Sequence, residues 1–160
     1  LYWGEADYSR SLRIAANTVR RVGTAKWSYG AIGVGATVPQ GQKGNGGGTQ
    51  FAAGGGHLQV AIESNRIEDC DTWAIWASSV VGLSVRNNTV LRPLHHRTWA
   101  TWVPPYPLPM ETVAFVTEST RVAVDGNCVI DPGPFARTLF NATGTATLRP
   151  GSQRGWLCDG

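Results

Sequence analysis

Four segments of this 160-residue chain repeat one eight-residue pattern without gaps. Each segment reads apolar, any, apolar, any, any, Asn, any, apolar. The four copies are residues 12–19, 60–67, 83–90 and 122–129. The alternation before the Asn predicts a strand with one buried face, and the apolar residue two places after it starts another strand. Such a repeat is typical of a solenoid, in which each unit packs on its neighbours.

The repeated asparagines are Asn17, Asn65, Asn88 and Asn127. Stacked coils would place these side chains about 4.8 Å apart, which is the usual spacing between strands. We therefore predict an internal ladder of hydrogen bonds between them. We also expect each Asn to lie at the bend itself, because Asn tolerates left-handed backbone angles. Their repetition makes them structural rather than catalytic residues.

A further short strand is predicted before each repeat. These strands are expected at residues 1–3, 30–34, 74–77 and 113–117, with 138–141 as the same element of a fifth coil and 146–148 after it. Each coil then has three short strands and three bends. The distances between successive Asn positions are 48, 23 and 39 residues. The two longer distances predict loop insertions at 36–56 and 94–111, on the faces that solenoids often use for binding.

The repeated asparagines with their apolar flanks and preceding strands resemble the repeat of the pectate-lyase-like superfamily. The resemblance covers roughly residues 1–150 and implies an all-β, right-handed parallel β-helix of about four to five coils. We place the coils at residues 1–151 and leave 152–160 as a C-terminal tail. Enzymes of this kind usually have more coils and an N-terminal cap. We therefore expect this chain to be the C-terminal part of a longer helix, or to receive coils from another subunit.

Composition excludes several other classes of protein. Apolar residues make up 42% of the chain and charged residues 16%, which argues against disorder. The net charge of +3 comes from scattered residues, so we expect no nucleic-acid partner. No apolar stretch approaches the roughly 20 residues of a membrane span, so we expect no membrane partner. The three cysteines leave two alternatives open, one disulfide or buried free thiols.

The resemblance implies that a sugar chain binds along the outer face of the strand before each Asn segment. By alternation we expect four residues to point inward: Ile32, Ile75, Phe115 and Leu139. Their neighbours then form the groove face, and they are Trp3, Glu5, Trp76, Ser78, Val116, Glu118 and Phe140.

Two tryptophans and two carboxylates are the first candidates on this face. Trp76 and Trp3 are candidate platforms for stacking sugars, with packing under a loop as the alternative. Asp71 and Glu118 are the candidate acid and base, because a glycosidase needs two carboxyl groups roughly 5 to 9.5 Å apart. Glu5 and Glu118 would be about 14 Å apart, too far to act as a pair. The alternative is that these carboxylates are solvated surface groups.

A basic run opens the second insertion. His96 is a candidate catalytic residue because imidazole transfers protons near neutral pH, and His95 and Arg97 are candidate substrate contacts. In a lyase, Arg97 or Lys26 would abstract the proton beside a uronate carboxylate. The alternative is a polar loop anchor. We predict no metal site and no cofactor, although the acidic run at 68–71 leaves calcium as an option without the spacing of a calcium loop.

These features favour a carbohydrate-active β-helix enzyme, a glycoside hydrolase or polysaccharide lyase whose partner is a polysaccharide. The alternative is a non-enzymatic adhesin or tailspike-like binding module. A third possibility is that the active site lies partly in coils outside this chain. The resemblance alone implies an extracellular or periplasmic location.

Overall fold

The computed structural model of the chain describes residues 9–23, 30–35, 37–39, 49–51, 56–96, 111–143, 146–151 and 156–158. Three parallel four-stranded sheets form the framework of this part of the chain. It contains no helix, and therefore none long and apolar enough to span a membrane. Our predictions for Trp3, Glu5, Lys26 and Arg97 lie outside the described residues.

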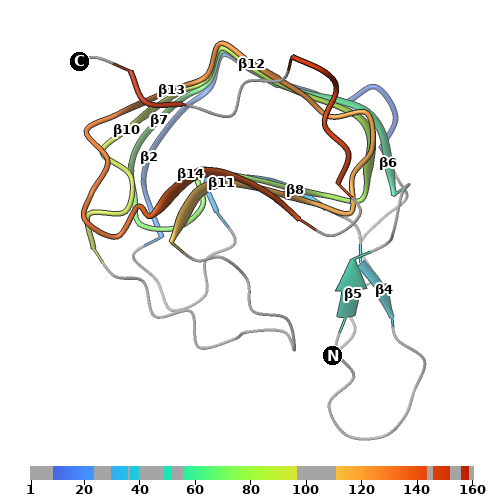
Figure 1. The fold of residues 1–160 in the computed structure, drawn as a ribbon, viewed down its shortest axis with the longest axis horizontal. Helices are drawn as coiled ribbons and strands as arrows, with labels where there is room; N and C mark the ends of the chain where they lie inside the picture. The colour runs from blue at the N-terminus through green and yellow to red at the C-terminus, as the bar shows by residue number, and fades with distance from the viewer. Residues whose placement is uncertain are drawn as a thin grey trace, which may run out of the picture.

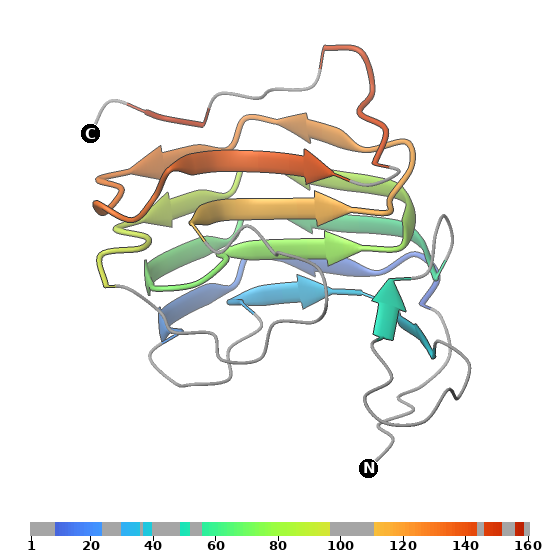
Figure 2. The same ribbon diagram turned by 60° about the horizontal axis from the view of Figure 1, so that its bottom comes forward.

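Each coil contributes one strand to each sheet, and the coils stack in chain order (Figures 1 and 2). The first sheet contains β1 (Arg13–Ala15), β6 (His57–Glu63), β9 (Val80–Arg86) and β12 (Ala123–Asp125). The second contains β2 (Thr18–Val22), β7 (Arg66–Cys70), β10 (Thr89–Leu91) and β13 (Cys128–Ile130). The third contains β3 (Ile32–Val34), β8 (Ile75–Ser78), β11 (Thr112–Thr117) and β14 (Thr138–Thr143). The fold is a parallel β-helix of about four coils, as predicted.

An antiparallel hairpin projects from the first coil. It consists of β4 (Thr37–Pro39) and β5 (Thr49–Phe51), and both strands fall within the predicted insertion at 36–56. Figure 1 shows the hairpin outside the stack of coils, beyond the third sheet. Most of the second predicted insertion, at 94–111, lies outside the described residues.

The asparagine ladder is confirmed. The Nδ2 group of Asn65 donates to Asn88 Oδ1 at 2.9 Å, and Asn88 Nδ2 donates to Asn127 Oδ1 at 2.8 Å. Asn17 Nδ2 reaches Asn65 Oδ1 at 3.0 Å. The strand pairings join Ile14 to Ile62 and Ile62 to Val85, which is the register that the sequence repeat predicts.

The prediction that Asn itself occupies the left-handed bend is wrong. The residue before each Asn has the positive φ angle instead, between 52° and 61° at Ala16, Ser64, Asn87 and Gly126. Two further bends repeat in the same way, with positive φ at Ser11, Gln59, Gly82 and Arg121, and at Arg21, Asp69, Arg92 and Asp131. The left-handed residue turns the chain, and the Asn that follows can then point inward along the ladder.

The prediction of which β11 side chains point into the core is also wrong, by one residue. Phe115 lies opposite Trp76 in the register, while Ala114 lies opposite Ile75. Phe115 is therefore on the outward row with Trp76, and Val116 points into the core. Every residue of β11 is buried, so its continuous apolar run has no alternation from which the facing can be read. In β14 the same register places Phe140 inward, where it joins the core.

The C-terminal tail, which matched no predicted coil, closes the last coil. A disulfide joins Cys128 to Cys158, and Leu157 pairs with Val129 in a parallel bridge. Trp156 is fully buried and stacks on Phe140, with ring centroids 5.4 Å apart. Cys70 remains a free, buried thiol. The three cysteines therefore form one disulfide and leave one buried free thiol, so both predicted alternatives occur.

Candidate functional site

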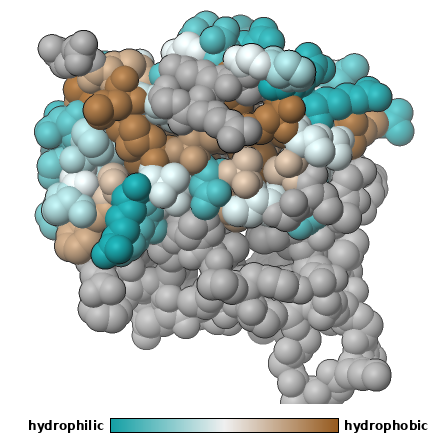
Figure 3. Space-filling view, viewed as in Figure 1, coloured by the Kyte–Doolittle hydropathy of each residue, from teal (hydrophilic) through white to brown (hydrophobic). Residues whose placement is uncertain are grey.

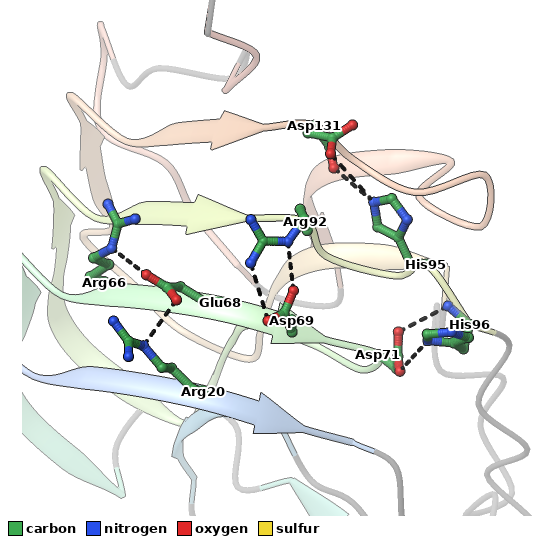
Figure 4. Close-up of polar contacts among 9 residues, drawn as sticks. All are labelled: Arg20, Arg66, Glu68, Asp69, Asp71, Arg92, His95, His96 and Asp131. Atoms are coloured by element: carbon green, nitrogen blue, oxygen red, sulfur yellow. Dashed lines mark hydrogen bonds and ion pairs between the residues drawn. The ribbon is translucent and has the colours of Figure 1, made fainter.

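Two of the predicted catalytic residues, Asp71 and His96, are in direct contact. Asp71 follows the end of β7, and the backbone N–H of Leu94 donates to the carbonyl of Cys70 at 2.7 Å. This bond holds the segment after β10 beside the end of β7. The backbone N–H of His96 then donates to Asp71 Oδ1 at 2.9 Å, and the ring Nδ1 lies 3.0 Å from Oδ2 (Figure 4).

The two partners differ strongly in their exposure. The Asp71 side chain is 10% exposed, whereas that of His96 is 84% exposed. A neutral imidazole that donates from Nδ1 keeps a lone pair on Nε2, and the carboxylate fixes this tautomer. The contact therefore produces an oriented imidazole whose other nitrogen is available to an incoming group.

A column of alternating charges runs across the second sheet beside this pair. It consists of Arg21, Asp69, Arg92 and Asp131, which occupy equivalent left-handed positions in the four coils. Arg92 contacts both oxygens of Asp69, at 2.7 and 3.2 Å. This hydrogen bond is the main reason why the pKa of Asp69 is lowered and that of Arg92 is raised. We refer to these four residues as the charge column.

The remaining acidic residue of the 68–71 run has its own cationic partners. Glu68 lies 2.5 Å from Arg66 and 2.9 Å from Arg20. The hydrogen bond from Arg66 is the largest cause of the lowered pKa of Glu68. The carboxylates of this run thus face three different directions (Figure 4). Within the described ranges, no three His, Cys, Asp or Glu residues gather as ligands for one metal ion.

His95 points away from the Asp71–His96 pair. Its Nε2 lies 3.0 Å from the backbone oxygen of Asp131, at the far end of the charge column. Gly133 lies against this segment, because a Cβ there would come within 2.5 Å of the His95 backbone. His95 therefore connects the second insertion to the bend after β13.

An aromatic cluster lies on the outward side of the third sheet. Trp73 stacks on Phe115 at 5.5 Å and on Trp76 at 6.4 Å between ring centroids. Trp73 and Phe115 are both 2% exposed, and Trp76 is partly exposed. The first two rings therefore support the third. Gly35 lies against the same face, since a Cβ there would be only 2.4 Å from the Trp76 ring.

The structure does not bring Glu118 to Asp71. Glu118 follows β11, and its neighbour Thr117 pairs with Ser78 at the end of β8. Asp71 instead precedes the start of β8 at Ile75. The two carboxylates thus lie at opposite ends of the strand. The four residue steps from position 75 to position 79 alone span about 13 Å at roughly 3.3 Å per residue.

Sequence reasoning missed Trp73 and misassigned Phe115. Trp73 was overlooked because it falls in a bend, outside the alternating strand pattern. Its spacing of three residues from Trp76 was the available signal. Phe115 was assigned to the core because the apolar run around it hid the register.

Comparison with known proteins gives no match: no family model, no curated protein and no solved structure is similar to this chain. The site therefore has to be interpreted from its own geometry.

Proposed function

We propose that this chain is a carbohydrate-active parallel β-helix protein of the pectate-lyase-like kind. In this proposal it binds a polysaccharide at the partly exposed ring of Trp76, on the outer side of the third sheet, and the Asp71–His96 pair transfers a proton. The observation that carries the proposal is the contact at 3.0 Å between a mostly buried carboxylate and an exposed imidazole. A carboxylate in this position orients the ring and stabilises its protonated form during proton transfer.

The aromatic cluster supports the choice of a sugar as ligand. Pyranose rings present C–H faces that pack on indole rings, and Trp76 is held in place by Trp73. Asp71 and Trp73 belong to the same bend between β7 and β8. The proton-transfer pair and the stacking surface are thus set by one short segment.

The proposed reaction is elimination rather than hydrolysis. Hydrolysis by two carboxyl groups requires a separation of roughly 5 to 9.5 Å, which Asp71 and Glu118 do not meet. Elimination from a uronate needs one base to remove the proton beside the carboxylate. His96 Nε2 would accept this proton, and the electron pair of the broken C–H bond would form a double bond to the neighbouring carbon. The bond from that carbon to the glycosidic oxygen would break, and the leaving oxygen would take a proton from water. Arg97, next in the chain, is the proposed partner for the substrate carboxylate.

A non-enzymatic binding module is the second candidate. It is favoured by the 84% exposure of His96, because a water-excluding pocket strengthens electrostatic catalysis. Both candidates fit an oxidising location outside the cytoplasm, where a disulfide such as Cys128–Cys158 persists.

The test is to incubate the purified chain with neutral and uronic polysaccharides while recording reducing ends and the absorbance of unsaturated products. We expect both signals from a uronic polymer. We expect His96→Ala to abolish them and Asp71→Asn to lower the rate about 100-fold or more, because the imidazole then loses the carboxylate that orients it. His95→Ala is the matched control and should retain activity.

The outcomes separate the candidates. Reducing ends without the absorbance would exclude elimination and indicate a hydrolase. Binding to a polysaccharide without any product, weakened by Trp76→Ala, would establish the binding module. A folded chain that neither binds nor cleaves any polymer of the panel would contradict the proposal.

A further inference from the structure

Four residues form a column at the bend that follows the second sheet, one from each coil. They are Gly23, Asp71, Leu94 and Gly133. Each of the last three donates its backbone N–H, at 2.7 to 2.9 Å, to the residue that precedes the column member of the coil before it. The column lies on the rim of the solenoid, where hydrophilic residues surround a hydrophobic interior (Figure 3). We call it the bend column.

The Asp71–His96 pair uses the two middle members of the bend column. Asp71 is the member from the second coil, and His96 lies two residues after Leu94, the member from the third coil. The pair therefore depends on how closely these two coils approach each other at the bend. The two end members, from the first and the fourth coil, are both glycine and both buried.

Gly23 packs directly against the bend that carries Asp71. An ideal Cβ at position 23 would lie 2.9 Å from the backbone nitrogen of Thr72 and 3.1 Å from the carbonyl carbon of Asp71. Glycine permits this approach of two backbones, because any side chain would overlap atoms that cannot rotate away. A larger residue at position 23 would have to push the Asp71 bend away from the first coil.

Gly133 packs in the same way against the segment that carries His96. A Cβ at position 133 would lie 2.3 Å from the carbonyl oxygen of Leu94 and 2.5 Å from the backbone nitrogen of His95. Gly133 does not have a positive φ angle, so the close contact alone requires glycine there. The next residue, His96, donates its backbone N–H to Asp71 Oδ1 at 2.9 Å. A displacement of residues 94 and 95 would therefore move the donor that holds the carboxylate.

We propose that Gly23 and Gly133 are positioning residues for the Asp71–His96 pair and act on it from opposite sides. The assignment rests on the proposed function, in which this pair transfers the proton. The two glycines let the second and third coils meet so that the carboxylate lies against Nδ1 and Nε2 remains available. The nearest contacts of both glycines are with residues 71–72 and 94–95, and not with Trp73 or Trp76. A methyl group at either position thus misaligns the pair and leaves the stacking surface in place.

The first test needs no substrate and measures the tautomer of His96. Nitrogen NMR is recorded in alkaline solution, where an ordinary imidazole is neutral. In the unchanged chain we expect the ring proton on Nδ1, because the carboxylate of Asp71 accepts it there. Gly23→Ala and Gly133→Ala should each give a ring that exchanges between both tautomers, as Asp71→Ala should.

Gly82→Ala is the matched control for these variants. Gly82 also has a positive φ angle, of 80°, but an ideal Cβ there would come no closer than 3.8 Å to its nearest contact. Gln59 and Arg121 occupy the equivalent left-handed positions of neighbouring coils and carry side chains. We expect Gly82→Ala to keep the Nδ1–H tautomer of His96.

The second test is kinetic and uses a uronic polymer. Gly23→Ala and Gly133→Ala should lower kcat about 100-fold, which is the loss expected when a catalytic group is misplaced by about 1 Å. KM should change by less than about twofold, because the rings that stack on the sugar are not displaced. If the unchanged chain cleaves no polymer, the proposed function fails, and the tautomer measurement still decides whether the glycines position the pair.

Two results would overturn the proposal. One is that both glycine variants keep the Nδ1–H tautomer while their circular dichroism shows native β-sheet content. The other is that both variants lose this content, since the glycines would then be required by the whole fold and not by the pair.

Discussion

The side chain of Asn88 takes part in four hydrogen bonds, all buried inside the solenoid. Its Oδ1 accepts from the backbone and the side chain of Asn65, and its Nδ2 donates to Asn127 and to the carbonyl of Ile62. Removing it would leave several buried polar groups without partners, each costing about 1 to 3 kcal/mol. The ladder is therefore a stabilising element whose members differ in importance with their depth.

We expect Asn88→Ala to lower the free energy of unfolding by about 3 to 4 kcal/mol. Asn17→Ala, at the exposed end of the same ladder, should cost about 1 kcal/mol, because water replaces the lost partners. Urea denaturation of the two variants measures this difference. Equal losses would show that burial of the ladder does not determine its contribution.

The thiol of Cys70 should be unreactive in the folded protein. Burial is the main cause that raises its pKa from 9.0 to about 11. The neutral thiol is thus favoured by folding, and this stabilising contribution is complete below pH 9 and is lost as the pH rises towards 11. We expect no alkylation of native Cys70 by iodoacetamide at pH 8 and rapid alkylation in urea. Alkylation of native Cys70 at pH 8 would contradict the expectation that this buried thiol is unreactive.

At the scale of the strands, the second sheet carries its charges in pairs that cross from coil to coil. Glu68 contacts Arg20 on β2 and Arg66 on its own strand, and Asp69 contacts Arg92 beyond β10. Exposed pairs of this kind contribute little individually. Two of them, Arg20–Glu68 and Asp69–Arg92, join neighbouring coils along one face.

These pairs predict an acid-sensitive fold. The pKa values of Glu68 and Asp69 are lowered by hydrogen bonds from Arg66 and Arg92. The contribution of these two carboxylates to folding stability is therefore present above their pKa values in the unfolded chain, which are near 4. It is lost as the pH falls through their lower pKa values in the folded protein. We expect the thermal midpoint to fall below pH 4, and to fall less in Arg66→Gln/Arg92→Gln. If the thermal midpoint of that variant falls by the same amount below pH 4, these ion pairs are not the cause of the acid sensitivity.

At the scale of the whole molecule, one disulfide closes one end of the solenoid. Cys128 and Cys158 are separated by 30 residues, and their bond keeps the tail on β13. Closing a loop of this length stabilises a protein by about 3 to 4 kcal/mol when the unfolded chain is constrained accordingly.

We therefore expect Cys128→Ser/Cys158→Ser to lower the free energy of unfolding by about 3 to 4 kcal/mol. Guanidinium denaturation followed by Trp fluorescence provides the measurement, since Trp156 leaves the Phe140 ring when the tail opens. A change below 1 kcal/mol would mean that packing alone holds the tail.

The repeat by itself determined the coil register, the ladder and the three sheets. It could do so because each coil packs only on its neighbours, so matching positions in successive copies of the pattern specify the tertiary contacts. Four equivalent Asn positions and their apolar flanks were enough to pair Ile14 with Ile62 and Val85. The contact of Asp71 with His96 was not predicted, although both residues were candidates.

Some features depend on where a loop or a chain end packs against the coils, and only the tertiary structure decided these. The uniformly apolar β11 contains no alternation, so its pairing with β8 was needed to place Phe115 outside. The separation of Asp71 from Glu118 followed from the ends of β8, which sequence patterns locate only within a few residues. The tail matched no repeat because it closes the solenoid instead of extending it. Its position depends on one disulfide and one Trp156–Phe140 stack, both formed between segments without any shared pattern.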